Sequence, residues 1–186
     1  MKISFREVTI DDAKMILDWR TSPGITQQMI TDIPYDLDAQ RKWIVDSYSK
    51  KDYYNWVILC DDTPIGCIYI QNFNFENAQT YWGFYKGSPG FPGVGSKIEA
   101  FLYNWLFFQV GIKNIFTEVF YSNVKVIDLH LSYGYKFMPE KDRVIYKNGR
   151  EILMVSLSLP LQDWDKEKYK DSISSFPTNH WKYSPV

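Results

Sequence analysis

A helical segment that begins at Ser96 is apolar on nearly every side, and this pattern limits the folds open to the chain. Hydrophobic side chains recur there with helical spacing, at Ile98, Phe101, Leu102, Trp105 and Leu106, and the apolar surface is widened by Phe107, Phe108 and Val110. A helix of this kind is stable only when other elements cover it. The chain is therefore expected to build a layered domain around this helix.

The other sequence patterns predict a mixture of strands and helices. Strands are expected at residues 3–8, 55–60, 65–73, 81–86, 112–120, 144–147 and 150–159, and helices at residues 9–20, 36–48, 96–110 and 123–133. Asp36 is a candidate helix cap, and Asn148-Gly149 is typical of a two-residue hairpin turn. Because strands and helices do not alternate strictly, we expect an α/β sandwich with a central mixed, largely antiparallel sheet flanked by helices.

These elements place one domain over residues 1–159. From Pro160 the composition turns polar, which predicts a C-terminal extension over residues 160–186 that does not lengthen the sheet. Trp164 and Trp181 are the candidate anchors of this extension.

Composition narrows the classes of function. The 186 residues carry a net charge of −1 and no basic stripe, which argues against binding to nucleic acid or to anionic membranes. The first residues lack the profile of a signal peptide, and no apolar run reaches membrane-spanning length, so we expect a cytosolic protein. Cys60 and Cys67 flank a predicted hairpin turn at residues 61–64 and could face each other. In this setting we interpret both as reduced packing residues.

The segment Gly90–Ser96 (GFPGVGS) lies between a predicted strand and the apolar helix. Free backbone N–H groups at a helix start form a site for phosphate, whereas a glycine cluster alone forms only a tight turn. A dinucleotide fingerprint would need glycine at Ile98, and a nucleotide P-loop would need Gly-Lys-Ser/Thr where Gly95-Ser96-Lys97 stands. Neither of these two phosphate loops fits.

Two blocks resemble the GNAT superfamily of acetyltransferases, over about residues 3–159. The family motif is Arg or Gln, two residues, Gly, one residue, and Gly or Ala; Gly93 and Gly95 match it, whereas Gly90 replaces the Arg or Gln. The second block runs from Glu118 to Asn123 and continues into a helix that ends with Tyr133-Gly134-Tyr135.

The resemblance implies that acetyl-coenzyme A is the co-substrate, without a metal. Backbone groups of the strand would pair with pantetheine, the glycine loop would hold the pyrophosphate, and an asparagine would contact the pantetheine arm. The residues at these positions are Phe84, Tyr85, Lys86, Phe91, Gly93, Val94, Gly95, Ser96 and Asn123. Asn123 could equally act only as a helix cap.

The resemblance also implies two catalytic candidates. His130 stands where many family members have a tyrosine that protonates the coenzyme A sulfur, and histidine can donate a proton near neutral pH. Glu118 matches an acid that some relatives use, through water, as the base for the amine. The alternatives are a structural histidine and an outward-facing strand carboxylate.

Finer resemblance concerns the acceptor. Trp19-Arg20-Thr21 and Ala39–Ile44 are similar to the ribosomal-protein and amino-sugar branch, while Tyr81–Tyr85 and Asp128–His130 look most like the pseudaminic-acid-pathway enzymes. This implies a small-molecule amino-sugar nucleotide as partner, acetylated on the 4-amino group of a UDP-linked dideoxy sugar. The candidate acceptor-binding residues are Trp19, Arg20, Gln28 and Trp82.

Two other functions share these motifs. One is a ribosomal-protein or drug-amine N-acetyltransferase, and the other is an acyl-coenzyme A-binding module without catalysis. The sequence leaves the oligomeric state open.

Overall fold

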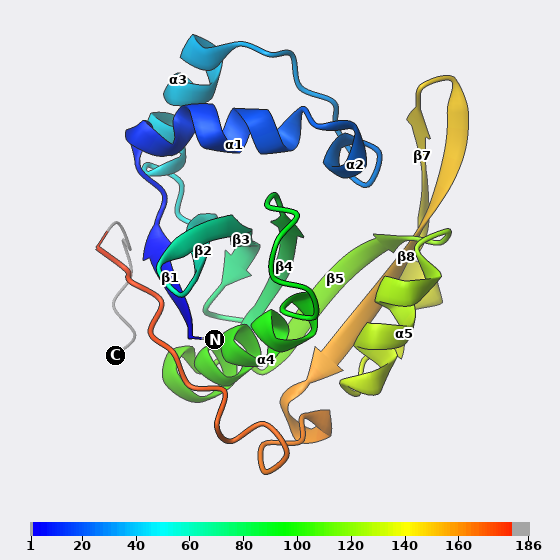
Figure 1. Cartoon of the computed structure of the whole chain (residues 1–186). Helices are drawn as coiled ribbons and strands as arrows, with labels where there is room; N and C mark the ends of the chain where they lie inside the picture. The colour runs from blue at the N-terminus through cyan, green and yellow to red at the C-terminus, as the bar shows by residue number, and fades with distance from the viewer. Residues whose placement is uncertain (1, 180–186) are drawn as a thin grey trace.

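The computed structural model describes residues 2–179, which form a mixed sheet with helices on both of its faces (Figure 1). The strands are β1 Ile3–Glu7, β2 Tyr54–Cys60, β3 Thr63–Asn74, β4 Gln79–Lys86, β5 Asn114–Phe120, β6 Lys136–Phe137, β7 Arg143–Lys147 and β8 Arg150–Pro160. The helices are α1 Ala13–Arg20, α2 Pro23–Thr26, α3 Leu37–Ser47, α4 Gly95–Trp105 and α5 Val124–Ser132. The predicted fold class is therefore confirmed.

The sheet order is β1-β2-β3-β4-β5-β8-β6, with β7 paired to β8. Every pairing is antiparallel except β4 with β5. That parallel pairing covers only Gln79–Tyr81 against Asn114–Phe116. Beyond it the two strands separate, so β4 continues to Lys86 with β3 on one edge only. The sheet thus opens like a wedge in its middle (Figure 1).

Local sequence cues explain several boundaries. Asp36 caps α3, since its Oδ1 accepts a hydrogen bond from the Ala39 amide at 2.9 Å. Asn148 and Gly149 both have positive φ, at 52° and 74°, as a two-residue hairpin turn requires. The first predicted hairpin turn is shorter than expected: only residues 61 and 62 form it, and Thr63 already belongs to β3.

Other boundaries differ from the sequence-based expectation. The predicted helix over residues 9–20 begins with a 3₁₀ turn at Ile10–Asp12, and the helix predicted over 96–110 changes to a π-helical turn at Leu106–Val110. The short strand β6 was not predicted, because its two exposed residues carry no alternating pattern.

The two cysteines lie on opposite faces of the sheet, which corrects the expectation that they could face each other. Cys60 belongs to the core cluster beneath α4, and Cys67 belongs to the cluster beneath α1 and α3. Cys60 pairs with Thr63 across the hairpin, and Cys67 pairs with Val57. Both are free and buried, as expected, and burial raises the pKa of the Cys67 thiol to about 12.

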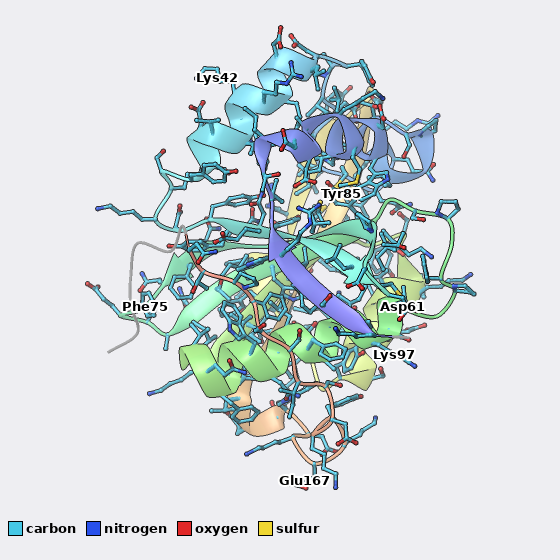
Figure 2. All side chains as sticks on the ribbon, turned by 60° about the vertical axis from the view of Figure 1, so that its left-hand side comes forward. Lys42, Asp61, Phe75, Tyr85, Lys97 and Glu167 are labelled. Carbon is cyan, nitrogen blue, oxygen red and sulfur yellow. The ribbon has the colours of Figure 1, made fainter. Side chains whose placement is uncertain are left out.

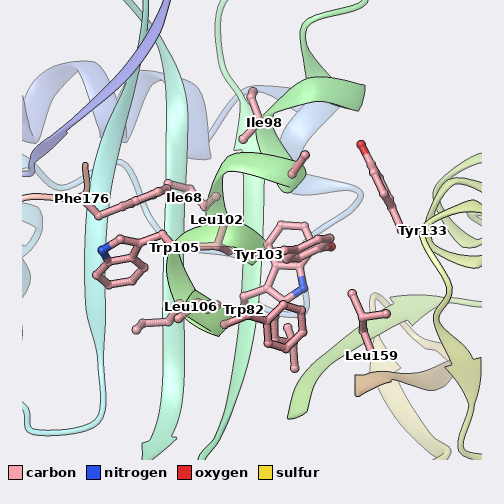
Figure 3. Packing of buried hydrophobic residues seen from close by; sticks show 14 of the residues in the cluster. Ile68, Trp82, Ile98, Leu102, Tyr103, Trp105, Leu106, Tyr133, Leu159 and Phe176 are labelled. Atoms are coloured by element: carbon pink, nitrogen blue, oxygen red, sulfur yellow. The ribbon is translucent and has the colours of Figure 1, made fainter. Parts of the chain in front are cut away.

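Helix α4 is the centre of the larger core, in agreement with its apolar sequence. Ile98, Leu102, Tyr103 and Leu106 are fully buried, and the Tyr103 ring meets Trp82 of β4 edge-on (Figure 3). Phe108 is the exception, since it is largely exposed. Because α4 is packed into this core, its N-terminus and the preceding glycine loop are held at the mouth of the wedge.

The segment after β8 covers the side of α4 that the sheet does not. Asn104 of α4 donates to the carbonyls of Tyr169 and Ser172 at 2.8 and 3.0 Å, and accepts from Trp164 Nε1 at 2.9 Å. Trp164 is buried, as expected of an anchor, while the loop around Glu167 projects away from the helix (Figure 2).

A second anchor of this segment is Phe176, which the polar composition concealed. Its ring stacks on Phe5 at 4.0 Å, and the next carbonyl, of Pro177, accepts a hydrogen bond from Trp56 Nε1 at 2.7 Å. The other predicted anchor, Trp181, lies outside the residues that the structure describes.

Candidate functional site

A cavity of about 600 Å³ fills the wedge between β4 and β5. One side, here called the glycine-loop wall, consists of Phe84–Lys86 together with Gly93, Gly95 and Ser96. The opposite side, here called the α2 wall, consists of Gly24, Ile25, Gln28, Met29 and Ile30. Residues of β5 and α5 close the inner end, among them Glu118, Asn123 and His130.

The glycine loop presents free backbone donors. Gly93 has φ of +74°, a left-handed conformation that favours glycine, and α4 begins two residues later. Within residues 2–179, no backbone carbonyl accepts a hydrogen bond from the amides of Gly93–Ser96. A Cβ on Gly95 would meet only Phe84, at 3.8 Å. The loop is therefore an open cradle for an anion at a helix N-terminus.

Lys86 adds a positive charge to this loop. Its Nζ donates to the carbonyl of Gly90 at 2.7 Å and lies 3.3 Å from that of Phe91. This ammonium group stands beside the position where the family motif would place an arginine or glutamine. The side chains of Phe91 and Val94 pack into the core and do not line the cavity, so these two residues can contribute only backbone amides.

Strand β4 offers an unpaired edge to the cavity. Phe84, Tyr85 and Lys86 line it, and their partners on the other edge belong to β3. Trp82 stacks parallel to Phe84 at 5.9 Å and is only 4% exposed, with its Nε1 donating to Tyr135 Oη at 2.8 Å. An extended ligand could pair with the free edge, while Trp82 forms part of the cavity floor.

Asn123 lies at the start of α5, but its side chain makes no capping hydrogen bond. Instead Nδ2 approaches Gln28 Oε1 of the α2 wall at 3.4 Å, so the two side chains meet across the cavity. The side chain of Asn123 therefore does not cap α5 in this structure. Its amide group is available to contact a ligand in the cavity.

His130 lies in the last turn of α5, and it is 3% exposed. Its Nδ1 lies 3.1 Å from Oε2 of Glu99, a fully buried carboxyl on α4. Tyr103 Oη donates to the same oxygen at 2.8 Å. Sequence reasoning missed Glu99, although a single carboxylate inside an otherwise apolar helix was a visible signal.

Glu118 lines the cavity, but both of its oxygens are engaged. Arg143 of β7 donates from Nε to Oε1 at 2.8 Å and from Nη2 to Oε2 at 2.9 Å. The Glu118 side chain is 19% exposed. This bidentate pair holds the carboxylate in place, and it leaves lone pairs for a water molecule.

The α2 wall is held by Lys147, at the tip of the β7–β8 hairpin. Its Nζ donates to the carbonyls of Thr26 and Met29, each at 2.6 Å, and forms an ion pair with Asp32 at 2.7 Å. The hydrogen bond from Lys147 lowers the pKa of Asp32 below its ordinary value. No sequence pattern pointed to Lys147, because its partners are more than a hundred residues away.

Two of the four candidate acceptor residues lie outside the cavity lining. A Cβ on Gly87 would come within 2.1 Å of the Trp19 ring, so this ring packs on the backbone. Arg20 Nη2 donates to the carbonyl of Thr31 at 3.3 Å, just after the last residue of the α2 wall. Gln28 and Trp82 do line the cavity.

A family model described as the acetyltransferase (GNAT) domain matches residues 5–156. The chain belongs to the GNAT acetyltransferase family. It is accordingly an acetyltransferase enzyme, and the GNAT fold binds acetyl-coenzyme A. No curated protein sequence matches the chain.

Solved structures with this GNAT fold include enzymes with different acceptors. Spermidine N-acetyltransferase from Vibrio cholerae, in complex with CoA and spermine, has a TM-score of 0.78 at 13% identity, covering 87% of this chain and 96% of that one. Apo FdhC, a nucleotide-linked sugar GNAT, has a TM-score of 0.70 at 21% identity, covering 91% and 89%. An uncharacterized protein from Bacillus halodurans scores 0.72 at 15% identity, covering 91% and 89%. At these sequence identities the similarity shows only that the fold is shared.

Two further observations concern the described part of the chain. Over residues 2–179, no cluster of three or more His, Cys, Asp or Glu side chains is suited to a metal ion. None of the helices in this range combines the length and apolar character needed to cross a membrane.

Proposed function

We propose that this GNAT enzyme transfers the acetyl group of acetyl-coenzyme A to the 4-amino group of a UDP-linked dideoxy amino sugar, in pseudaminic-acid or related surface-glycan synthesis. The observation that carries the proposal is the charge of the cavity. Among the residues that line it, Glu118 is the single carboxylate, and Arg143 neutralises it. An acceptor with one amine and an anionic diphosphate suits such a lining better than a polycation does.

The glycine-loop wall supplies the coenzyme site in this proposal. The amides of Gly93–Ser96 hold the pyrophosphate, and Lys86 adds charge to the same loop. Pantetheine pairs with the free edge of β4 over Phe84–Lys86, and Asn123 contacts the arm from the opposite side. The thioester is thereby directed toward the inner end of the wedge, where His130 lies.

The reaction needs a neutral amine, a polarised carbonyl and a proton for the departing thiolate. His130 is the candidate donor of that proton, because it lines the inner end and is an imidazole able to change charge near neutral pH. A backbone N–H of β4 stabilises the oxyanion. Glu118, fixed by Arg143, is the candidate base acting through water.

The sugar-nucleotide structure among those with this fold supports the acceptor class, and the apolar α2 wall supports it further. Ile25, Met29 and Ile30 offer packing surface for a deoxysugar methyl group, while Gln28 offers hydrogen bonds. Spermidine, the acceptor named for another structure with this fold, carries several positive charges. It would find no free carboxylate among the lining residues.

The test is a comparison of kcat/KM for four acceptors: the UDP-linked 4-amino sugar, the free amino sugar, an N-terminal ribosomal peptide and spermidine. Uridine diphosphate contributes remote binding energy that positions the amine, so its removal should lower kcat as well as raise KM. A ribosomal peptide or spermidine that matches the sugar nucleotide would overturn the acceptor class. Binding of acetyl-coenzyme A without turnover of any amine would instead favour a non-catalytic module.

A further inference from the structure

Glu99 is an acidic residue that has no role in the proposed coenzyme and acceptor sites. It is fully buried in α4, with Oε2 close to Tyr103 Oη and His130 Nδ1, while Oε1 has no hydrogen-bond partner among the described residues. Placing a carboxyl group in an apolar core is costly unless donors compensate it. Both donors lie on the same oxygen, and one of them is the proposed acid.

The contact with Glu99 determines which nitrogen of His130 faces the cavity. An ionised Glu99 can only accept a hydrogen bond, and in that state the hydrogen of the contact is carried by Nδ1 of His130. Nε2 lies on the opposite side of the ring and has no hydrogen-bond partner among residues 2–179. Unlike Glu99 Oε1, which is buried without a partner, Nε2 is not fully shielded from solvent. Since His130 lines the cavity, Nε2 is the nitrogen that meets the ligand.

We propose that Glu99 is a positioning residue for His130 in the acetyl transfer. Its carboxylate fixes the Nδ1–H tautomer and compensates the positive charge when the imidazole is protonated, so that Nε2–H is presented to the thioester sulfur. This inference rests on the proposed role of His130. In the reaction a C–N bond forms, the C–S bond breaks, and the proton lost by the amine balances the proton gained by sulfur.

The other groups around the imidazole are already occupied or uncharged. On α4, the Tyr103 hydroxyl donates its hydrogen bond to Glu99. On β4, the Trp82 N–H donates its hydrogen bond to the Tyr135 hydroxyl. The Tyr135 ring lies 5.1 Å from the imidazole, and burial raises the pKa of its hydroxyl well above the ordinary value. Glu99 is therefore the one acidic side chain in contact with His130 within the described chain.

The kinetic test compares Glu99→Gln, His130→Ala and the double variant, with Tyr103→Phe as matched control. Glu99→Gln keeps the shape but removes the charge, so kcat should fall roughly 10- to 100-fold, less than on loss of the imidazole itself. The KM for acetyl-coenzyme A should stay within about twofold, because the glycine loop is untouched. The double variant should be no slower than His130→Ala, since the two residues act as a unit. Tyr103→Phe removes only the other donor and should keep most of kcat.

A spectroscopic readout is independent of turnover. The chain has only two histidines, so the ¹⁵N signals of His130 are identified by their loss in His130→Ala. In the parent protein the neutral ring should be protonated at Nδ1, and Glu99→Gln should shift it toward Nε2–H. Additive kinetic effects, or an Nε2–H ring in the parent, would overturn the role of Glu99. A parent that acetylates no amine would overturn the proposed function, while the nitrogen signals would still decide whether Glu99 sets the ring.

Discussion

The glycine-loop wall and the α2 wall of the cavity are held by different kinds of contact. The first is made of backbone: free amides at the start of α4 and the open edge of β4, whose other edge is paired with the preceding strand β3. The second has its own local hydrogen bonds and is joined to the β7–β8 hairpin by the ammonium group of Lys147, which contacts residues 118 and 121 positions away. Substitutions in the glycine-loop wall should weaken coenzyme binding and so lower turnover of every acceptor alike. Substitutions in the α2 wall should raise the KM for the acceptor and leave the KM for the coenzyme unchanged.

The largest effect is expected where the two walls meet, at His130. Replacing it with alanine should lower kcat by about 10²–10⁴-fold, the usual effect of losing a positioned acid, with little change in coenzyme affinity. The measurement is steady-state kinetics with chemistry shown to limit the rate. The kcat of Glu118→Gln, measured in parallel, tests whether the protein supplies a general base. A near-parental kcat in His130→Ala would make this histidine structural.

Gly95→Arg should disable the glycine-loop wall for all acceptors. In the parent, acetyl-coenzyme A at a hundredfold excess over its Kd should add about 2.7 kcal/mol to the free energy of unfolding. The arginine side chain would occupy the phosphate cradle and abolish this gain, read as a lost thermal shift. Gly95→Ala is the control, because its Cβ would make only an ordinary contact with Phe84 at 3.8 Å. A thermal shift that survives in Gly95→Arg would place the pyrophosphate elsewhere.

Lys147→Met should loosen the α2 wall selectively. Two carbonyls would lose their donor, so the free energy of unfolding should fall by about 1–3 kcal/mol and the acceptor KM should rise roughly tenfold. The coenzyme KM should not change. Lys113→Met is the control, since this lysine is exposed and its side chain makes no hydrogen bond or ion pair within residues 2–179. Equal losses for coenzyme and acceptor would contradict the division into two walls.

Gly90→Arg should strengthen the coenzyme site modestly. It restores a basic residue at the motif position, and a Cβ there would meet only Ser88 Oγ at 3.8 Å. An exposed charge pair of this kind contributes about 0.5 kcal/mol, roughly a twofold lower Kd for acetyl-coenzyme A. Calorimetry at two salt concentrations would measure it. Weaker binding in this variant would mean that the Lys86 ammonium already fills the position.

The smallest effect concerns acid pH and the ion pair between Asp32 and Lys147. Because the folded-state pKa of Asp32 is depressed, the pair contributes stability above the ordinary value of 3.8, and this contribution is lost as the pH falls through the lower folded value. Asp32 is exposed, so salt should weaken the effect. Thermal unfolding of the parent and Asp32→Asn should converge at low pH; a constant difference would assign the contribution to another contact.

Features that depend on neighbouring residues could be predicted from the sequence. The Asp36 cap, the Asn148-Gly149 turn and the glycine loop before α4 each follow from a few consecutive residues. Contacts between distant segments could not be predicted, because the residues around Lys147 and Phe176 carry no information about the distant residues that these two side chains contact. Glu99 lies between these cases: its burial was implied by the apolar helix, but its partner His130 was not.

The open edge of β4 has a consequence for solubility. An unpaired strand edge is a template on which another polypeptide can add a strand, and proteins protect such edges. Here the edge lies inside the wedge, facing the α2 wall that Lys147 holds, rather than at the outside of the sheet. A polypeptide from another molecule would have to enter this cavity before it could pair with the edge. The position of the edge inside the wedge therefore protects the chain against self-association through it.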